Sequence, residues 1–179
     1  MTNISDKKVA IVVDDYFEQA EFTGPRDALV EAGAEVTVIS TDGGEIHGLN
    51  HVEAGDTFQA DMSTAEADPN DYDALVLPGG AVNADNLRMD KDIQNWVRTY
   101  MEAGKPVAAI CHAPWVLVSA KVAKGKKLTS YHTIQDDIRN GGSDWTDEEV
   151  VVDGNLITSR QPGDIPAFNR EIINALGRV

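Results

Sequence analysis

The fold is decided by the stretch Lys105-Pro-Val-Ala-Ala-Ile-Cys-His-Ala-Pro-Trp-Val-Leu-Val-Ser119. Residues 107–110 form an apolar run of strand length, and a helix is expected to begin shortly after it. Cys111 lies at the junction. A tight turn from strand to helix pushes its side chain out of the backbone and turns the following amides toward it. We therefore expect chemistry at the carboxyl end of a buried strand.

The alternation of strand and helix recurs along the chain. Gly33 and Gly104 each follow a segment with apolar residues at helical spacing, and an apolar run follows each glycine. The expected strands are Val9–Val13, Ala34–Ser40, Tyr72–Leu77 and Val107–Ile110, and the expected helices are Phe22–Ala32 and Ile93–Ala103. This alternation implies a mostly parallel sheet with helices on both faces, which predicts an α/β, flavodoxin-like three-layer sandwich.

The C-terminal part is expected to add an antiparallel edge. Glu149–Val152 and Asn155–Thr158 flank Asp153-Gly154, a pair favoured in two-residue hairpin turns. Asp164–Leu176 then has the pattern of a closing helix. Gly43–Phe58 is interpreted as an irregular excursion or a hairpin. With no repeat or linker, we expect one domain over residues 1–179.

Composition limits the classes of partner. Asp and Glu number 30 against 15 Lys and Arg, which gives a formal net charge of -15. This negative charge repels the phosphate backbone of nucleic acids and anionic lipid. We therefore expect small molecules or protein as partners, and neither nucleic acid nor membrane. One cysteine forms no internal disulfide, and the first eight residues do not resemble a signal peptide. We expect a cytoplasmic protein; its acidity fits a salt-rich cytosol or an ordinary acidic protein.

Three loops are expected to meet at one end of the sheet. In open parallel sheets, sites form beyond the carboxyl ends of the strands. The loops Asp14–Glu21 and Pro78–Asp85 each follow an expected strand there, as does the pair Cys111-His112. These loops hold the candidate residues.

Segments along nearly the whole chain resemble the PfpI-type intracellular cysteine protease family. That family lies within the class I glutamine amidotransferase-like superfamily, which also holds Parkinson's-disease-associated glyoxalase/deglycase proteins. The segments are Tyr16-Phe-Glu-Gln-Ala-Glu21 before Pro25, Asp73-Ala-Leu-Val-Leu-Pro-Gly-Gly80, Gly104-Lys-Pro-Val-Ala-Ala-Ile-Cys-His112, Glu149-Val-Val-Val-Asp153, and Ser159-Arg-Gln-Pro162 through Pro166-Ala-Phe-Asn-Arg-Glu171. One departure is Ala113-Pro114, where the family often has Gly-Pro.

The resemblance implies roles for particular residues. Glu21 matches the glutamate whose carboxyl group approaches the nucleophilic sulfur. Asp85 matches an acidic residue that reaches the histidine of an adjoining subunit, which implies self-association into a dimer or hexamer with the active site near the interface. The resemblance also implies a hydrolase of the peptidase or deglycase kind with a role in stress response.

Cys111, His112 and Glu21 are the expected catalytic residues, with Asp85 as the fourth. A helix start lowers the thiol pKa from its ordinary ~8.5, which favours thiolate, whereas a lone cysteine in an apolar stretch is otherwise a small buried hydrophobe. Glu21 and Cys111 would share a proton, or Glu21 is an ordinary charge at a helix start. His112 serves as base only if the turn folds its ring over the sulfur. Asp85 is alternatively a helix N-cap.

Other residues are expected to bind the substrate or its oxyanion. An amide from Gly79-Gly80 and that of His112 could hold the oxygen of a tetrahedral intermediate, although a tight turn requires the same glycines. Glu18, Tyr131 and His132 complete the set as lining residues. His47 and His51 are interpreted as decorating the excursion, and no metal or other cofactor is expected, since convincing ligand spacing is missing. Trp96, Trp115 and Trp145 are expected to pack in the core or at an interface.

Three functions remain as hypotheses. The first is a cysteine-dependent hydrolase acting on peptide or amide bonds, or on glycated or reactive carbonyl compounds such as methylglyoxal. The second is a redox-sensing or chaperone-like stress protein with an oxidisable cysteine. The third, glutamine amidotransfer, is disfavoured because the chain has no histidine after His132 for a glutaminase triad.

Overall fold

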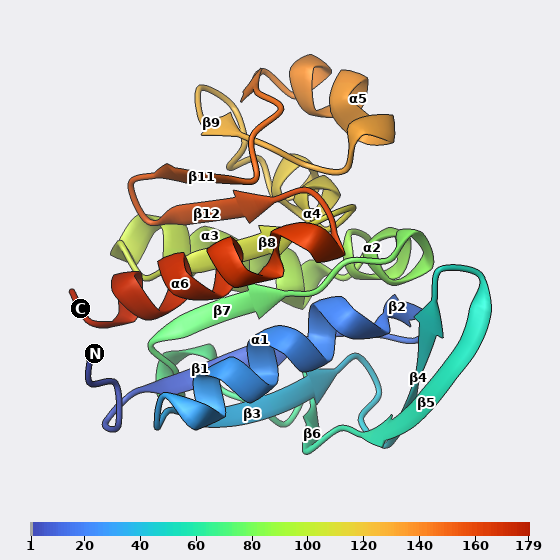
Figure 1. Ribbon diagram of the computed structural model, residues 1–179, viewed down its shortest axis with the longest axis vertical. Coiled ribbons are helices and arrows are strands. Elements are labelled where there is room, and N and C mark those ends of the chain that lie inside the picture. Colours follow the sequence, from blue (N-terminus) through green and yellow to red (C-terminus); the bar gives the residue numbers. More distant parts are fainter. Residues whose placement is uncertain (1) are drawn as a thin grey trace.

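The computed structural model describes residues 2–179 and contains a seven-stranded sheet between two layers of helices (Figure 1). The sheet order is β11-β12-β8-β7-β1-β3-β6. The strands are β1 Lys8–Val12, β3 Glu35–Ser40, β6 Met62–Ser63, β7 Ala74–Leu77, β8 Val107–Ile110, β11 Val150–Asp153 and β12 Leu156–Ser159. All neighbours are parallel except β11 with β12. The prediction of a flavodoxin-like three-layer α/β sandwich is confirmed.

The direction of the strand order reverses beside β1. Taken in chain order, β1, β3, β7, β8 and β12 occupy the spatial order 2-1-3-4-5, which is the flavodoxin-like arrangement. The chain leaves β1 toward β3 on one side and later returns to β7 on the other. The loops that follow β1 and β7 therefore diverge at their carboxyl ends, where ligands bind in such sheets.

Helices cover both faces. They are α1 Gln19–Glu31, α2 Ala81–Leu87, α3 Lys91–Ala103, α4 Pro114–Ser119, α5 Gln135–Asn140 and α6 Ile165–Leu176, with short 3-10 helices at Pro69–Asp71, His132–Ile134 and Pro162–Asp164. In Figure 1, α1 and α6 lie side by side in front of the sheet, and α3 lies behind it.

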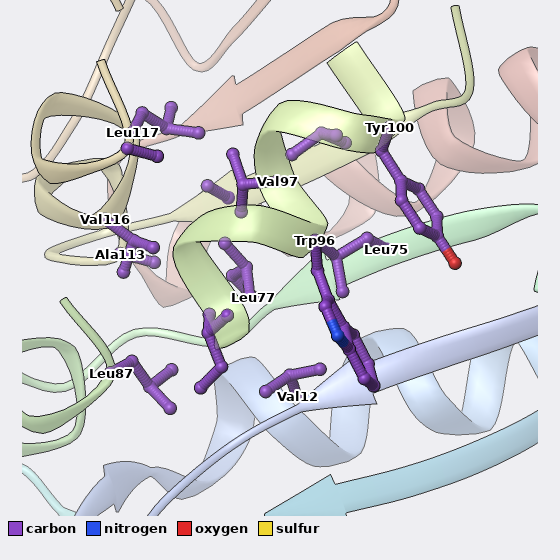
Figure 2. Packing of buried hydrophobic residues seen from close by; sticks show 14 of the residues in the cluster. Val12, Leu75, Leu77, Leu87, Trp96, Val97, Tyr100, Ala113, Val116 and Leu117 are labelled. Atoms are coloured by element: carbon purple, nitrogen blue, oxygen red, sulfur yellow. The ribbon is translucent and has the colours of Figure 1, made fainter. Parts of the chain in front are cut away.

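Each strand contributes to two cores because both faces of the sheet are covered. Leu75 and Leu77 of β7 face the α3 side, whereas Ala74 and Val76 face α1 and α6. Figure 2 shows Trp96, Val97 and Tyr100 of α3 beside the sheet residues Val12, Leu75 and Leu77. Burial of each large apolar side chain contributes about 1.5–3 kcal/mol. The expectation of a packing role holds for Trp96, which is buried in this core.

The segment expected as an excursion or a hairpin is a hairpin. Its strands, β4 Glu45–Asn50 and β5 Glu53–Gln59, are antiparallel, and β4 pairs in parallel with β2, Phe17–Glu18. In Figure 1 this hairpin lies at the same end as β2 and α2, toward which the head of β7 points. The hairpin thus lies beside the carboxyl ends of the strands.

Several short elements were not predicted. The helices α2 and α5 and the two-residue strands β2, β6, β9 Lys127–Leu128 and β10 Asp144–Trp145 have too few residues to show a periodic pattern. Helix α2 corrects one interpretation: it begins at Ala81 after Gly80, so Asp85 lies inside it and is not an N-cap. The aspartate that caps a helix here is Asp90, whose side chain accepts hydrogen bonds from two amides of α3.

Candidate active site

Cys111 lies on a left-handed turn at the end of β8. Its φ of 65° is uncommon for a residue with a side chain and costs about 1–2 kcal/mol. The Cys111 amide donates to the Ser159 carbonyl at 3.0 Å, and its carbonyl accepts from the Tyr131 amide at 2.8 Å. These bonds hold the strained conformation. The sharp turn expected between a strand and a helix is therefore present, and α4 begins at Pro114.

The turn brings the imidazole of His112 over the sulfur. His112 Nδ1 lies 3.1 Å from Cys111 Sγ, although neighbouring side chains normally diverge. The ring stacks on Tyr131 with centroids 5.0 Å apart and packs in a T-shaped arrangement with Trp115, with centroids 5.3 Å apart. Its other nitrogen, Nε2, lies 3.5 Å from Thr133 Oγ1. Burial, and to a smaller extent the nearby His132, lowers the pKa of His112, so the ring is neutral at pH 7 and able to accept a proton.

Glu21 reaches the same sulfur from the first turn of α1 and is 0% exposed. Burial, reinforced by the charge of Glu18, raises the pKa of Glu21 to about 8. The Cys111 thiol and the Gly79 amide lower this pKa in part, but neither carboxyl oxygen has a partner of normal hydrogen-bond geometry. Desolvation therefore dominates, and Glu21 is protonated at neutral pH.

The expected thiolate is not the resting form of Cys111. Burial and then the charge of Glu21 raise the pKa of the Cys111 thiol, while the amides of Gly80 and His112 lower it by a smaller amount. The prediction of a lowered pKa was wrong because Cys111 is only 7% exposed and because α4 has six residues, too few for a strong dipole. At pH 7 the thiol, the imidazole and the Glu21 carboxyl group are all neutral.

Two glycines make room for this arrangement. A Cβ on Gly79 would lie 2.1 Å from a Glu21 carboxyl oxygen and 2.5 Å from the Cys111 Cβ. Gly80 has a φ of +97°, and a Cβ there would meet the backbone of Phe17 and Glu18 within 2.9 Å. The turn after β7 therefore lies directly against both the sulfur and the carboxyl group.

A cavity of about 810 Å³ opens over the sulfur. Its lining includes Glu18, Glu21, Gly80, Cys111, His112 and Tyr131 from the sequence-predicted set. Tyr16, Ala81 and Val82 also line the cavity and lie in two of the expected loops, although the sequence did not single them out. The remaining lining residues were not predicted; they are Leu49, His51, Val52, Gln161, Pro162 and Gly163. The hairpin contributes three of these. The sequence contains no local signal for them, because their position depends on how β4 pairs with β2.

Other predicted residues lie outside the cavity. The ring of His132 lies tilted against that of Tyr131, with centroids 4.5 Å apart. Gly79 lies against Cys111 without lining the cavity. Asp85 is exposed on α2 and is not among the lining residues, so its proposed contact with His112 of an adjoining subunit stays a prediction. On the hairpin, His47 Nδ1 lies 2.9 Å from Asp15 Oδ1, in the loop after β1, and His47 Nε2 lies 3.3 Å from Glu45 Oε1.

His51 lies on the hairpin, as expected, but it also lines the cavity, which the sequence did not indicate. Its amide donates to the Glu18 carboxylate at 3.1 Å, which ties the hairpin to the start of α1.

Over residues 2–179, no set of three or more His, Cys, Asp or Glu side chains is arranged to hold a metal ion. Trp115 and Trp145 are half-buried and donate to Asp137 and Ser130.

The chain matches the model of the DJ-1/PfpI family over residues 7–175. It belongs to this family. The resemblance predicted from the five segments is thereby confirmed, and the match covers the cysteine turn, the Glu21 helix and the Gly79-Gly80 turn together.

Similar proteins include enzymes and a stress protein. The chain is 45% identical over 172 residues to Protein/nucleic acid deglycase 2 of Escherichia coli, covering 96% of this chain and 98% of the relative. It is 42% identical over 171 residues to General stress protein 18 of Bacillus subtilis, covering 95% and 98%. The crystal structure of Drosophila melanogaster DJ-1beta matches with a TM-score of 0.87 and 33% identity, covering 96% of this chain and 90% of that one.

None of the helices within residues 2–179 has the length and apolar character to cross a membrane.

Proposed function

We propose that this protein is a cysteine-dependent hydrolase of the deglycase kind, with Cys111 as nucleophile. The observation that carries the proposal is the 3.1 Å contact between Cys111 Sγ and His112 Nδ1 at the floor of a cavity, with a buried acid beside it. The deglycase name of the Escherichia coli relative supports a glycated or reactive carbonyl compound as substrate. A stress-response role is supported by the name of the Bacillus subtilis relative.

Activation begins from the neutral resting pair. As substrate arrives, His112 Nδ1 takes the thiol proton and the sulfur electron pair forms a bond to the carbonyl carbon. The π electrons of the carbonyl move to its oxygen. The amides of Gly80 and His112, which approach the sulfur, donate to this oxyanion in the proposed mechanism. Protonated Glu21 adds a neutral donor beside the sulfur without repelling the new negative charge.

Product release requires proton return and water. With an amide-like substrate, collapse of the oxyanion breaks the carbon–nitrogen bond, and the nitrogen takes the proton from His112. Water then hydrolyses the thioester and restores the thiol. With an α-keto aldehyde the first adduct is a thiohemiacetal. Its aldehyde carbon is oxidised by two electrons as the neighbouring keto carbon is reduced, so hydrolysis gives a hydroxy acid without an external oxidant.

The experiment measures lactate formed from methylglyoxal and N-acetylarginine regenerated from its methylglyoxal adduct, with a fluorogenic peptide alongside. Wild-type protein is expected to consume the carbonyl compounds. Cys111→Ala is expected to have no activity, with a free energy of unfolding within about 2 kcal/mol of the wild-type value. Retained turnover in Cys111→Ala would refute the nucleophile assignment. Turnover of the peptide alone would show that the protein is a peptidase and not a deglycase.

A redox-sensing or chaperone-like role is the second candidate. Both buried carboxyl oxygens of Glu21 lack a partner of normal geometry and lie beside Cys111, where the protonated acid could donate to a sulfinate oxygen. Intact mass after mild peroxide tests this role. Gain of two oxygens together with no turnover of any carbonyl compound or peptide would favour sensing.

We also propose that the protein is cytoplasmic and that it self-associates into a dimer or hexamer in which Asp85 of one subunit approaches His112 of another. This role of Asp85 is supported by its exposed position on α2, which leaves its side chain accessible to a second copy of the chain. Light scattering at micromolar concentration distinguishes these assemblies from a monomer. A monomer with full activity would refute the composite site.

A further inference from the structure

The lining of the cavity over Cys111 is biased toward negative charge. Its lining contains two glutamates and two histidines but no lysine or arginine. The chain as a whole carries a formal charge of -15, which has the same sign as this local bias. Glu21 is neutral at pH 7, which leaves Glu18 as the carboxylate charge of the cavity.

The Glu18 carboxylate is positioned but not neutralised. It precedes α1 without capping the helix, and its oxygens accept from the His51 amide at 3.1 and 3.4 Å. Within residues 2–179, Glu18 takes part in no ion pair. A fixed, half-buried carboxylate facing a cavity keeps much of its field, because the surrounding protein screens it less than water does.

The field of Glu18 reaches the reacting centre. Its charge is the largest electrostatic cause, after burial, of the raised pKa of Glu21, whose carboxyl group lies beside Cys111. The same charge that disfavours a negative Glu21 would attract a positively charged group. A substrate with its carbonyl carbon at the sulfur would bring such a group into this field.

We propose that Glu18 is a specificity-determining residue that selects substrates with a positive charge next to the electrophilic carbon, as in carbonyl adducts of arginine side chains. This inference rests on the proposed function and specifies its substrate class. Phosphate-bearing substrates, such as carbonyl adducts of nucleotides, meet an unneutralised carboxylate and no cation in the cavity. The protein is therefore a deglycase for protein side chains in preference to nucleotides.

A labelling experiment tests the field without relying on turnover. Cys111 is treated at pH 7 with two methanethiosulfonates that share one leaving group, one carrying a trimethylammonioethyl group and the other a sulfonatoethyl group. In each case the sulfur forms a disulfide and methanesulfinate leaves. Both reagents meet the same thiolate fraction, so the ratio of their rates, divided by the ratio for N-acetylcysteine, reports the local charge alone.

The wild-type ratio is expected to favour the cationic reagent by about tenfold, and Glu18→Gln is expected to lower it at least about threefold. Glu102→Gln is the matched control: it makes the same change of charge near the end of α3, just before the start of β8 and hence away from the carboxyl ends of the strands. Loss of Glu18 also lowers the pKa of Glu21. The same comparison is therefore repeated in Glu21→Gln protein, where residue 21 cannot ionise.

Turnover of methylglyoxal adducts of N-acetylarginine and of guanosine monophosphate completes the test. Glu18→Gln is expected to lower kcat/KM for the arginine adduct relative to the nucleotide adduct at least threefold. Equal loss for both substrates, or an unchanged labelling ratio in both backgrounds, would overturn the inference and leave the proposed function standing. Absence of turnover for every substrate would refute the proposed function, while the labelling ratio would still decide whether Glu18 sets the field.

Discussion

Cys111 Sγ and His112 Nδ1 lie 3.1 Å apart although the two residues are adjacent in sequence. The left-handed φ of Cys111 makes this possible, because it turns both side chains to one side of the chain. Tyr131 and Trp115 then hold the imidazole from two directions. The base is therefore positioned by the strained turn and by aromatic packing.

Replacing the base tests this arrangement directly. His112→Gln should lower kcat 10²–10⁴-fold, since general base catalysis typically contributes about that much. The variant should also lose the lower limb of the activity–pH profile, because no imidazole then has to be neutral. Thr133→Val, which removes only the 3.5 Å contact to Nε2, provides a milder comparison. Activity of His112→Gln within threefold of wild type would show that another group accepts the thiol proton.

Glu21 should make stability depend on pH. The unfolded chain releases this proton near 4.5, whereas the folded chain holds it to about 8. Between these values the unfolded state binds fewer protons, so the free energy of unfolding falls as pH rises. The contribution is fully present below pH 4.5 and lost on passing through about pH 8. At about 1.4 kcal/mol per pKa unit, the loss is on the order of a few kcal/mol.

Denaturant unfolding of wild type and Glu21→Gln at several pH values measures this effect. Glutamine has nearly the same shape and does not titrate, so the difference in unfolding free energy between the two proteins should shift in favour of the variant from pH 5 to pH 8. A difference that stays constant over this range would mean that Glu21 ionises with an ordinary pKa.

Gly79 should tolerate no side chain. A Cβ there would lie 2.1 Å from the Glu21 carboxyl group and 2.5 Å from the Cys111 Cβ, so Gly79→Ala must move one of them. We expect a loss of about 1–3 kcal/mol in unfolding free energy and a large loss of activity. Gly163→Ala is the control for stability, because an added Cβ meets nothing within 4 Å there. Equal melting temperatures of the two variants would contradict the close packing.

The strand-helix alternation sufficed to predict the parallel strands β1, β3, β7 and β8 of the sheet, although not the two-residue strand β6. Leu75 and Leu77 pack on one face and Ala74 and Val76 on the other, so β7 has the continuous apolar sequence of a strand buried on both sides. The three loops at the carboxyl ends followed from that topology, and they do bring Glu21, Gly79 and Cys111 together.

The electrostatics of the site could not be predicted in the same way. The expected thiolate depended on a local helix dipole, whereas the pKa of Cys111 is set mainly by burial and by Glu21, which is 90 residues away in the sequence. His51 was missed for a similar reason. Its place in the cavity depends on the pairing of β4 with β2, which joins only Phe17 and Glu18 to the hairpin.

Backbone strain at Cys111 predicts an unusual order of stability. Alanine keeps the Cβ that makes a φ of 65° unfavourable, whereas glycine removes it. Cys111→Gly should therefore be as stable as Cys111→Ala or up to about 1 kcal/mol more stable, although glycine normally destabilises ordered structure. Both variants lack the nucleophile, so thermal unfolding is the measurement. A glycine variant at least 1 kcal/mol less stable than the alanine variant would show that the turn is not strained.

The composite site predicts complementation between two inactive proteins. If Asp85 of one subunit supports His112 of its neighbour, Asp85→Asn should be strongly impaired, and Cys111→Ala inactive. After joint refolding, a Cys111→Ala subunit supplies Asp85 to the intact cysteine of an Asp85→Asn subunit, so random pairing in a dimer restores about a quarter of wild-type sites. Asp92→Asn, an exposed change in the first turn of α3, is the matched control and should keep full activity. An Asp85→Asn protein as active as this control would place Asp85 outside the reaction, and an impaired one that gains nothing from mixing would mean that Asp85 acts within its own chain.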